Sequence, residues 1–173
     1  MRRIVVTKVD NNLATLQGGL TMKLHHLGAV VRDADATLTF YCEVLGAKLL
    51  WDEKQPQQGE QTDTIFGFEQ TEVRVVGVEL HGTTIEFFEF LQPELQPLGN
   101  ASTNFSTIGW KHPAFEVTDV EAEVERLKIE GVRFVFPVQT LPGGAKMVYF
   151  LDNDGLMLEF IQPSAADAAD EGK

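Results

Sequence analysis

The chain has 173 residues, a hydrophobic fraction of 43% and a charged fraction of 23%, which is typical of a folded globular protein and excludes wholesale disorder. Its formal net charge of −12 repels phosphate backbones and anionic lipid, so we expect neither nucleic acid nor a membrane as a partner. Cys42 is its single cysteine and no apolar run approaches the length of a membrane span, which predicts a cytoplasmic protein without disulfides.

The two ends of the chain are expected to be peripheral. Residues 1–22 form an N-terminal extension whose only apolar run, Ile4-Val5-Val6, is too short for a signal peptide. Residues 164–173 have the sequence SAADAADEGK, which contains no large apolar side chain. We therefore predict a disordered tail over 164–173.

Between these ends the sequence repeats. Residues 88–93 (FEFLQP) recur as residues 158–163 (LEFIQP). Upstream of each copy, a segment of eight residues begins with His and ends with Asp, at 26–33 and again at 112–119. Because these matches occur in the same order, they predict two modules, 23–93 and 110–163, joined by a linker over 94–109.

The first module is expected to be strand, helix and three further strands. Leu24 to Val31 is a short apolar stretch typical of a strand. Asp33 is a helix cap and Gly46 ends the helix. The later strands are predicted at 48–52, 73–80 and 83–91.

The second module repeats this order. Thr118 and Glu121 predict a capping box, and a buried stripe of Val120, Val124 and Leu127 predicts a helix that ends before Gly131. Strands are predicted at 134–138, 146–151 and 156–162, with a hairpin turn over 152–155. The expected fold class is therefore α+β, built from two βαβββ modules with mixed sheets.

Strand periodicity selects four candidate site residues. His26 and His112 are each the first residue on one face of a predicted strand, and the residues that follow on that face are small or polar. Glu89 and Glu159 lie within apolar strands, where a carboxylate needs a partner. Two histidines and two glutamates at matching places suggest one shared metal site. His25 and Glu86 fall on the opposite faces in this interpretation.

The chain resembles the vicinal oxygen chelate superfamily, which includes glyoxalase I, methylmalonyl-CoA epimerase, extradiol dioxygenases and bleomycin-resistance proteins. The resemblance rests on LHHLGAVVRDADATLTFYCEVLGAKLLW, TTIEFFEFLQP, KHPAFEVTDVEAEVERLKIEGV and LDNDGLMLEFIQP, and covers about residues 23–163. It implies that the two modules form a cupped sheet around one divalent metal ion. The ligand positions implied are His26, Glu89, His112 and Glu159. Such a mixed set suits Ni, Co, Zn, Mn or Fe.

This ligand set looks most like glyoxalase I, which implies a metal-dependent lyase or isomerase of the glyoxalase I or epimerase type. The expected reaction is proton transfer through a metal-chelated enediolate of a small substrate with vicinal oxygens. Glu159 is the expected base and Glu89 the opposing acid or second base, with Glu116 as the next candidate base. Candidates for recognising an acidic glutathione moiety are Arg32, Arg74 and Lys146.

The same resemblance leaves three possible functions open. The protein is a lyase or isomerase, an iron-dependent ring-cleaving dioxygenase, or a non-catalytic protein that binds a ligand or an antibiotic. We also expect a homodimer, because each module leaves sheet edges that association would cover. The metal site forms either within one chain or between two chains.

Overall fold

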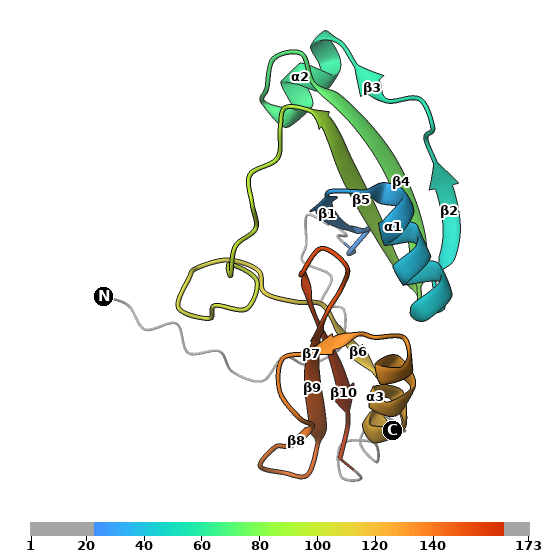
Figure 1. Cartoon of the computed structure of the whole chain (residues 1–173), viewed down its shortest axis with the longest axis vertical. Helices are drawn as coiled ribbons and strands as arrows, with labels where there is room; N and C mark the ends of the chain where they lie inside the picture. The colour runs from blue at the N-terminus through green and yellow to red at the C-terminus, as the bar shows by residue number, and fades with distance from the viewer. Residues whose placement is uncertain (1–22, 165–173) are drawn as a thin grey trace, which may run out of the picture.

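Two sheets with the same strand order organise the chain (Figure 1), whose computed structural model describes residues 23–164. In the first sheet the order is β1-β5-β4-β2, and in the second it is β6-β10-β9-β7. β1 runs parallel to β5 and β6 runs parallel to β10, whereas the remaining pairs are antiparallel. The α+β fold of two mixed βαβββ modules is therefore confirmed. The extension over 1–22 and all but the first residue of the tail lie outside the described residues.

The first module holds two helices, and the second of them was not predicted. Its strands are β1 (Leu27–Val31), β2 (Lys48–Asp52), β3 (Gln57–Gln58), β4 (Glu72–Leu80) and β5 (Thr83–Gln92). α1 (Ala34–Thr39) continues into a π-helical turn, η1 (Phe40–Val44). The unpredicted helix is α2 (Glu60–Phe66), which is polar and ends at Gly67 in the left-handed conformation. Its sequence has no regular apolar stripe, so the periodicity that reveals other helices is missing.

The second module follows the prediction with two corrections. Its elements are β6 (Ala114–Glu116), α3 (Val120–Ile129), β7 (Arg133–Phe134), β8 (Gln139–Thr140), β9 (Lys146–Leu151) and β10 (Met157–Gln162). The strand expected over 134–138 is split between β7 and β8, and Pro137, which lacks a backbone N–H, lies in the gap. The cap of α3 is Asp119 rather than Thr118, because the Asp119 carboxylate accepts the backbone N–H of Ala122 at 3.0 Å.

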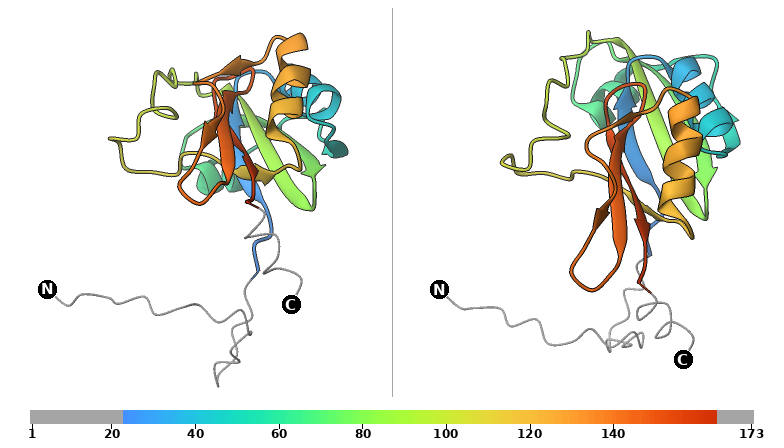
Figure 2. Two further views of the ribbon diagram at one scale, coloured as in Figure 1. Left: turned by 90° about the horizontal axis from the view of Figure 1, so that it is seen from below. Right: turned by 60° about the horizontal axis from the view of Figure 1, so that its bottom comes forward.

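Side chains from both modules form one hydrophobic core. The stripe of Val120, Val124 and Leu127 on α3 is buried as predicted and belongs to the same cluster as Val31 and Phe87 of the first module. The views in Figures 1 and 2 place α1 and α3 on the same side of the molecule. The helices therefore cover the buried faces of their sheets, and the opposite sheet faces are free to line sites.

The turn between β9 and β10 ties the two modules together. The buried Tyr41 hydroxyl donates to the Asp152 carboxylate at 3.2 Å, and the Arg32 guanidinium donates to Asp154 at 2.6 Å. The side chain of Asn153 reaches Thr37 of α1 at 3.3 Å. Burial, as the larger cause, and the nearby Asp152 charge, as the second, raise the pKa of Tyr41 well above its usual value. The Tyr41 hydroxyl therefore stays protonated and donates to Asp152.

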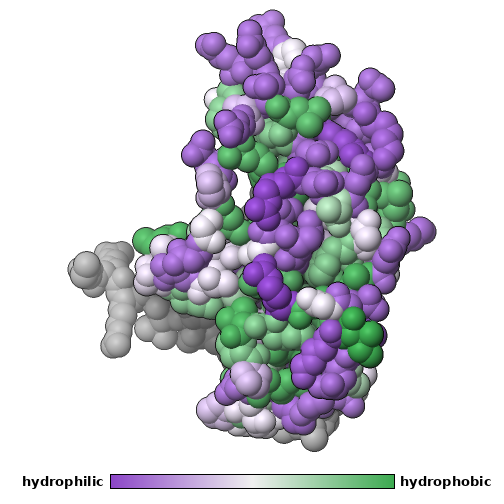
Figure 3. All heavy atoms as spheres, in the orientation of Figure 1, coloured by the Kyte–Doolittle hydropathy of each residue, from purple (hydrophilic) through white to green (hydrophobic). Residues whose placement is uncertain are grey.

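The surface differs between the modules. Figure 3 shows a largely hydrophilic face over the first module and more apolar surface over the second. Phe105 and Ile108 of the linker and Trp110, which follows it, are exposed, and Ile108 and Trp110 are fully accessible to solvent. No helix within residues 23–164 is long and apolar enough to cross a membrane.

Candidate functional site

The second module brings His112 and Glu159 together. His112 lies two residues before Ala114, which pairs with Glu159 across the parallel β6 and β10 strands. The two side chains consequently project from the same face, and His112 Nε2 lies 2.7 Å from Glu159 Oε2. Both side chains are largely buried, at 18% and 10% exposure. The expected proximity of this histidine and this glutamate is therefore observed.

Aromatic rings surround this pair. Tyr149 of β9 lies directly across from Glu159, and its ring centroid is 4.6 Å from that of His112. Phe105 of the linker stacks on Tyr149, and Phe136 contacts it edge-on. Burial, and then the Glu159 carboxylate, raise the pKa of Tyr149, so its hydroxyl remains protonated and can donate a hydrogen bond.

The first module contains an equivalent pair, formed by His26 and Glu86. His26 Nε2 lies 3.4 Å from Glu86 Oε2, and His26 Nδ1 lies 2.8 Å from the Nδ1 atom of His25. Gly28, two residues after His26, pairs with Glu86 across β1 and β5. This offset is the same as that between His112, Ala114 and Glu159, so Glu86 is the positional counterpart of Glu159.

Glu89 lies elsewhere. It pairs with Val31 at the far end of β1, and its carboxylate is 3.5 Å from Arg74 Nη1. Arg74 also binds Asp52 and the Asp35 side chain of α1, so this cluster lies on the helix-covered face. Because Glu86 and Glu89 are three residues apart, they point to opposite faces of the strand. The expected neighbour of His26 was Glu89, and the structure corrects it to Glu86.

The two His–Glu pairs are not joined within one chain. Among residues 23–164, which include all four side chains, no group of three or more histidine, cysteine, aspartate or glutamate residues is close enough to share a metal ion. Each module therefore presents one His–Glu pair on its open sheet face.

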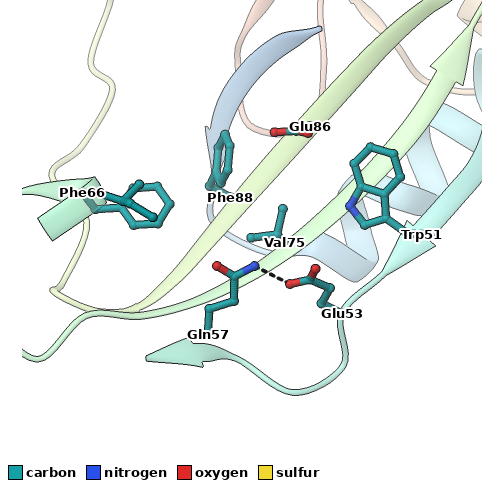
Figure 4. Close-up of a pocket in the computed structure, with 8 residues that line it drawn as sticks. Trp51, Glu53, Gln57, Phe66, Val75, Glu86 and Phe88 are labelled. Atoms are coloured by element: carbon teal, nitrogen blue, oxygen red, sulfur yellow. Dashed lines mark hydrogen bonds between the residues drawn. The ribbon is translucent and has the colours of Figure 1, made fainter. Parts of the chain in front are cut away.

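A cavity of about 460 Å³ adjoins the first pair (Figure 4). Its walls come from β2, β4, β5, the β3 region and α2, and its lining residues are Trp51, Glu53, Gln57, Ile65, Phe66, Val75, Glu86 and Phe88. Trp51 lies flat over Gly77, where a Cβ atom would overlap the indole ring. Glu86 is thus both the partner of His26 and part of the cavity wall.

The close approach of Trp51 to Gly77 leads to a testable expectation. Gly77→Ala should destabilise the fold by about 1–3 kcal/mol, because the added methyl group displaces the indole from a packed position. Chemical denaturation measures this change. In a Trp51→Leu background the same substitution should cost clearly less, and an equal cost in both backgrounds would contradict the contact as the cause.

The site residues missed at the sequence level are Glu86, Trp51, Gln57, Phe66 and Tyr149. Glu86 was assigned to the wrong face because the repeat was aligned on FEFLQP and LEFIQP. Aligning TTIEFF (residues 83–88) with LMLEFI (residues 156–161) pairs Glu86 with Glu159 instead. Gln57 and Phe66 belong to the irregular stretch around α2, which has no counterpart in the second module.

The cations considered for recognising an acidic substrate are all engaged in ion pairs. Arg32 binds Asp154 at 2.6 Å, Arg74 binds Asp35 at 2.6 Å, and Lys146 binds Glu121 at 2.6 Å. None of the three lines the cavity. Glu116, the reserve candidate for the base, is exposed on β6 and shares the face of Ala114.

Residues 23–160 match the model of the Glyoxalase/Bleomycin resistance protein/Dioxygenase superfamily. The chain belongs to this superfamily. A lactoylglutathione lyase of Neisseria meningitidis is 31% identical over 147 residues, which cover 84% of this chain and 94% of that protein. A 2-epi-5-epi-valiolone epimerase of Actinomyces is 28% identical over 145 residues, or 80% of this chain and 78% of the epimerase.

Solved structures of superfamily proteins share the fold. A glyoxalase family protein from Bacillus cereus superposes with a TM-score of 0.72 at 19% identity, covering 85% of this chain and 97% of that one. A fosfomycin resistance protein, FosX, from Listeria monocytogenes, solved in complex with Mn(II), gives a TM-score of 0.58 at 17% identity and covers 89% and 100% of the two chains. Divalent metal binding therefore occurs among structures of this fold.

Proposed function

We propose that this protein is a metal-dependent lyase or isomerase of the glyoxalase I or epimerase type, acting on a small molecule with vicinal oxygens. The observation that supports this most is the pair of equivalent His–Glu contacts, His26–Glu86 and His112–Glu159, at matched positions on the open faces of two repeated modules. The lactoylglutathione lyase and epimerase relatives support the reaction class.

The residues present fit a divalent metal ion. Two imidazoles and two carboxylates are ligands that Ni, Co, Zn, Mn and Fe accept. Nδ1 of His112 is buried without a hydrogen-bond partner, and the polar contact of the ring is that of Nε2 with Glu159. Because His112 Nε2 and Glu159 Oε2 lie 2.7 Å apart, both atoms face the same point and would be able to bind one ion placed there. The proposed ligands are His26, Glu86, His112 and Glu159, with Glu86 replacing Glu89.

We propose that the complete site forms between two chains of a homodimer. Each pair alone offers two protein ligands, and the packing of the modules within a chain keeps the pairs apart. A two-fold dimer repeats the same contact twice, so it would bring each first-module pair to a second-module pair of its partner and create two equivalent sites.

Within such a site the side chains have separate tasks. When bound, the divalent ion supplies Lewis-acid stabilisation of negative charge developing on the substrate oxygens. Glu159 removes a proton from the carbon beside those oxygens, because its carboxylate is the acceptor held most firmly in place, against His112. Glu86, protonated from solvent, gives a proton to the neighbouring carbon or to the opposite face of the same carbon, and Glu159 releases its proton to solvent. The protonated Tyr149 hydroxyl is available as a donor beside Glu159.

The two glutamates of β5 provide a direct test of the ligand set. Glu86→Ala should lower metal affinity by at least about 100-fold, since even changes behind the ligands cost 10–100-fold. Glu89→Ala is the matched control in the same strand, and it should leave metal affinity unchanged while removing a partner of Arg74. Titration with a metal-competing chelator measures both. Loss of metal in Glu89→Ala but not in Glu86→Ala would restore the original assignment.

The reaction class is tested by elemental analysis of the purified protein, followed by turnover assays with methylglyoxal–glutathione hemithioacetal and with methylmalonyl-CoA. We expect one divalent ion per complete site, and solvent-deuterium incorporation at the reacting carbon of any substrate that is isomerised. The presence of a glutamate in both pairs argues against the ring-cleaving dioxygenase, which needs only one carboxylate beside two histidines. Iron-dependent oxygen uptake with a catechol would favour that alternative, and a purified protein without metal would favour the ligand-binding one.

A further inference from the structure

The cavity beside Glu86 has an aromatic floor. Trp51 covers Gly77 of β4, while Phe66 of α2 and Phe88 of β5 close the opposite side at a centroid separation of 5.7 Å from each other (Figure 4). No hydrogen bond within the described residues involves the indole N–H of Trp51. A flat apolar ring of this kind is a surface on which a ligand ring packs.

The polar groups of the cavity are acceptors and a neutral amide. Glu53 accepts a hydrogen bond from the Gln57 side-chain amide at 2.6 Å, and Glu86 lies on the side nearest His26. Carboxylates and amides bind hydroxyl groups well, since hydroxyls donate to them. The same carboxylates repel a ligand that carries carboxylate or phosphate groups.

Cationic side chains are absent from the cavity wall and mostly engaged elsewhere. Among the residues that the structure describes, Lys54 and Arg74 bind Asp52 on the other face of the first sheet. Lys111 is held by the carbonyls of Ala101 and Asn104. Lys128 and Arg126 bind glutamates of their own helix. The other cations in this range do not line the cavity either: Lys23, Arg32, Lys48, Arg133 and Lys146.

We propose that the substrate of this site is an uncharged, hydroxyl-bearing ring compound that packs on Trp51 and donates hydrogen bonds to Glu53 and Gln57, and that acidic conjugates such as glutathione or coenzyme A adducts are disfavoured. This inference rests on the proposed function for its chemistry, because Glu86 joins the cavity to the His26 pair. The binding preference is argued from the cavity of the first module and does not require the metal ion.

Fluorescence provides the test, because the chain has only two tryptophans, Trp51 and Trp110. Trp110 is fully exposed at the start of the second module, so Trp110→Phe leaves Trp51 as the sole reporter without disturbing a packed site. The full-length variant is titrated with three probes: 2-keto-myo-inositol as an uncharged cyclic hydroxyketone, S-hexylglutathione, and propionyl-coenzyme A. Metal content of each sample is measured in parallel.

We expect the hydroxyketone to change Trp51 emission saturably, with a dissociation constant at least about tenfold lower than that of either acidic probe. Its affinity should be insensitive to salt, as for a neutral ligand. Glu53→Ala should weaken it, measured by calorimetry, and Lys48→Gln should not, because Lys48 does not line the cavity.

Two results would overturn the proposal. One is that S-hexylglutathione or propionyl-coenzyme A binds more tightly than the hydroxyketone and that Arg133→Gln abolishes this binding. Such a result would show that a cation of the second module binds an acidic substrate. The other is no response of Trp51 to the hydroxyketone at millimolar concentration. Metal analysis distinguishes a failure of the proposed function from a failure of the proposed substrate class. Binding of the hydroxyketone to a protein that holds no metal would contradict the proposed function alone. A metal-loaded protein that prefers an acidic probe would contradict the substrate class alone.

Discussion

Glu159→Gln is expected to lower kcat by roughly 10²–10⁴-fold, the range typical for loss of a general base. Glutamine keeps the size of the side chain and an oxygen that can still face His112, but it cannot take up a proton at neutral pH. The loss should therefore appear in kcat more than in KM, since an interaction made mainly in the transition state is removed. Steady-state kinetics and metal analysis of the same preparations measure both effects.

The interpretation depends on two comparisons. Metal content should fall much less than turnover, which separates the loss of a base from the loss of a ligand. Glu116→Gln is the matched control, because Glu116 shares the sheet face of Ala114 but is exposed and takes no part in the contact between His112 and Glu159. Full turnover of Glu159→Gln at full metal occupancy would move the base to another residue, with Glu116 tested next.

Mixing two inactive variants should restore activity. His26→Ala and His112→Ala each remove one ligand from every site of their own homodimer, so each is expected to be nearly inactive. In a heterodimer of the two variants with shared sites, one site combines both damaged modules and the other combines both intact modules. Co-expression with two different affinity tags, followed by tandem purification, isolates this heterodimer for metal and activity measurements.

The same heterodimer distinguishes the two possible assemblies. If each site formed within one chain, every site would contain one damaged module and mixing would restore nothing. A doubly substituted chain, His26→Ala with His112→Ala, paired with an unaltered chain is the control: shared sites would each contain one damaged module, so that mixture should stay inactive. Activity in this control with none in the first mixture would assign the sites to single chains.

Much of the architecture is encoded locally, and for this reason it was predictable. Asp33 accepts the Ala36 N–H at 2.9 Å as a helix cap should, and Gly46 and Gly131 follow the helices with φ of 76° each. Strand β2 spans the predicted residues 48–52, and β9 spans the predicted residues 146–151. These features depend on short-range patterns of capping, alternation and turn residues.

The site was less predictable because it depends on strand register. The motif 88–93 invites an alignment that makes Glu89 the counterpart of Glu159, whereas the parallel pairing of β1 with β5 selects Glu86. An error of an odd number of residues exchanges the two faces of a strand, and register is determined by contacts between strands that are distant in sequence. The role of Trp51 likewise depends on Gly77, a neighbour across β2 and β4 that no local pattern reveals.

The turn between β9 and β10 has a consequence for the continuity of the polypeptide. Its residues Asp152, Asn153 and Asp154 bond to Tyr41, Thr37 and Arg32, and a common core lies beneath them. None of these interactions passes through the segment 94–109, so the covalent connection is not what keeps the modules aligned. A chain cleaved in that segment would therefore remain one particle, and two separately synthesised halves would reassemble.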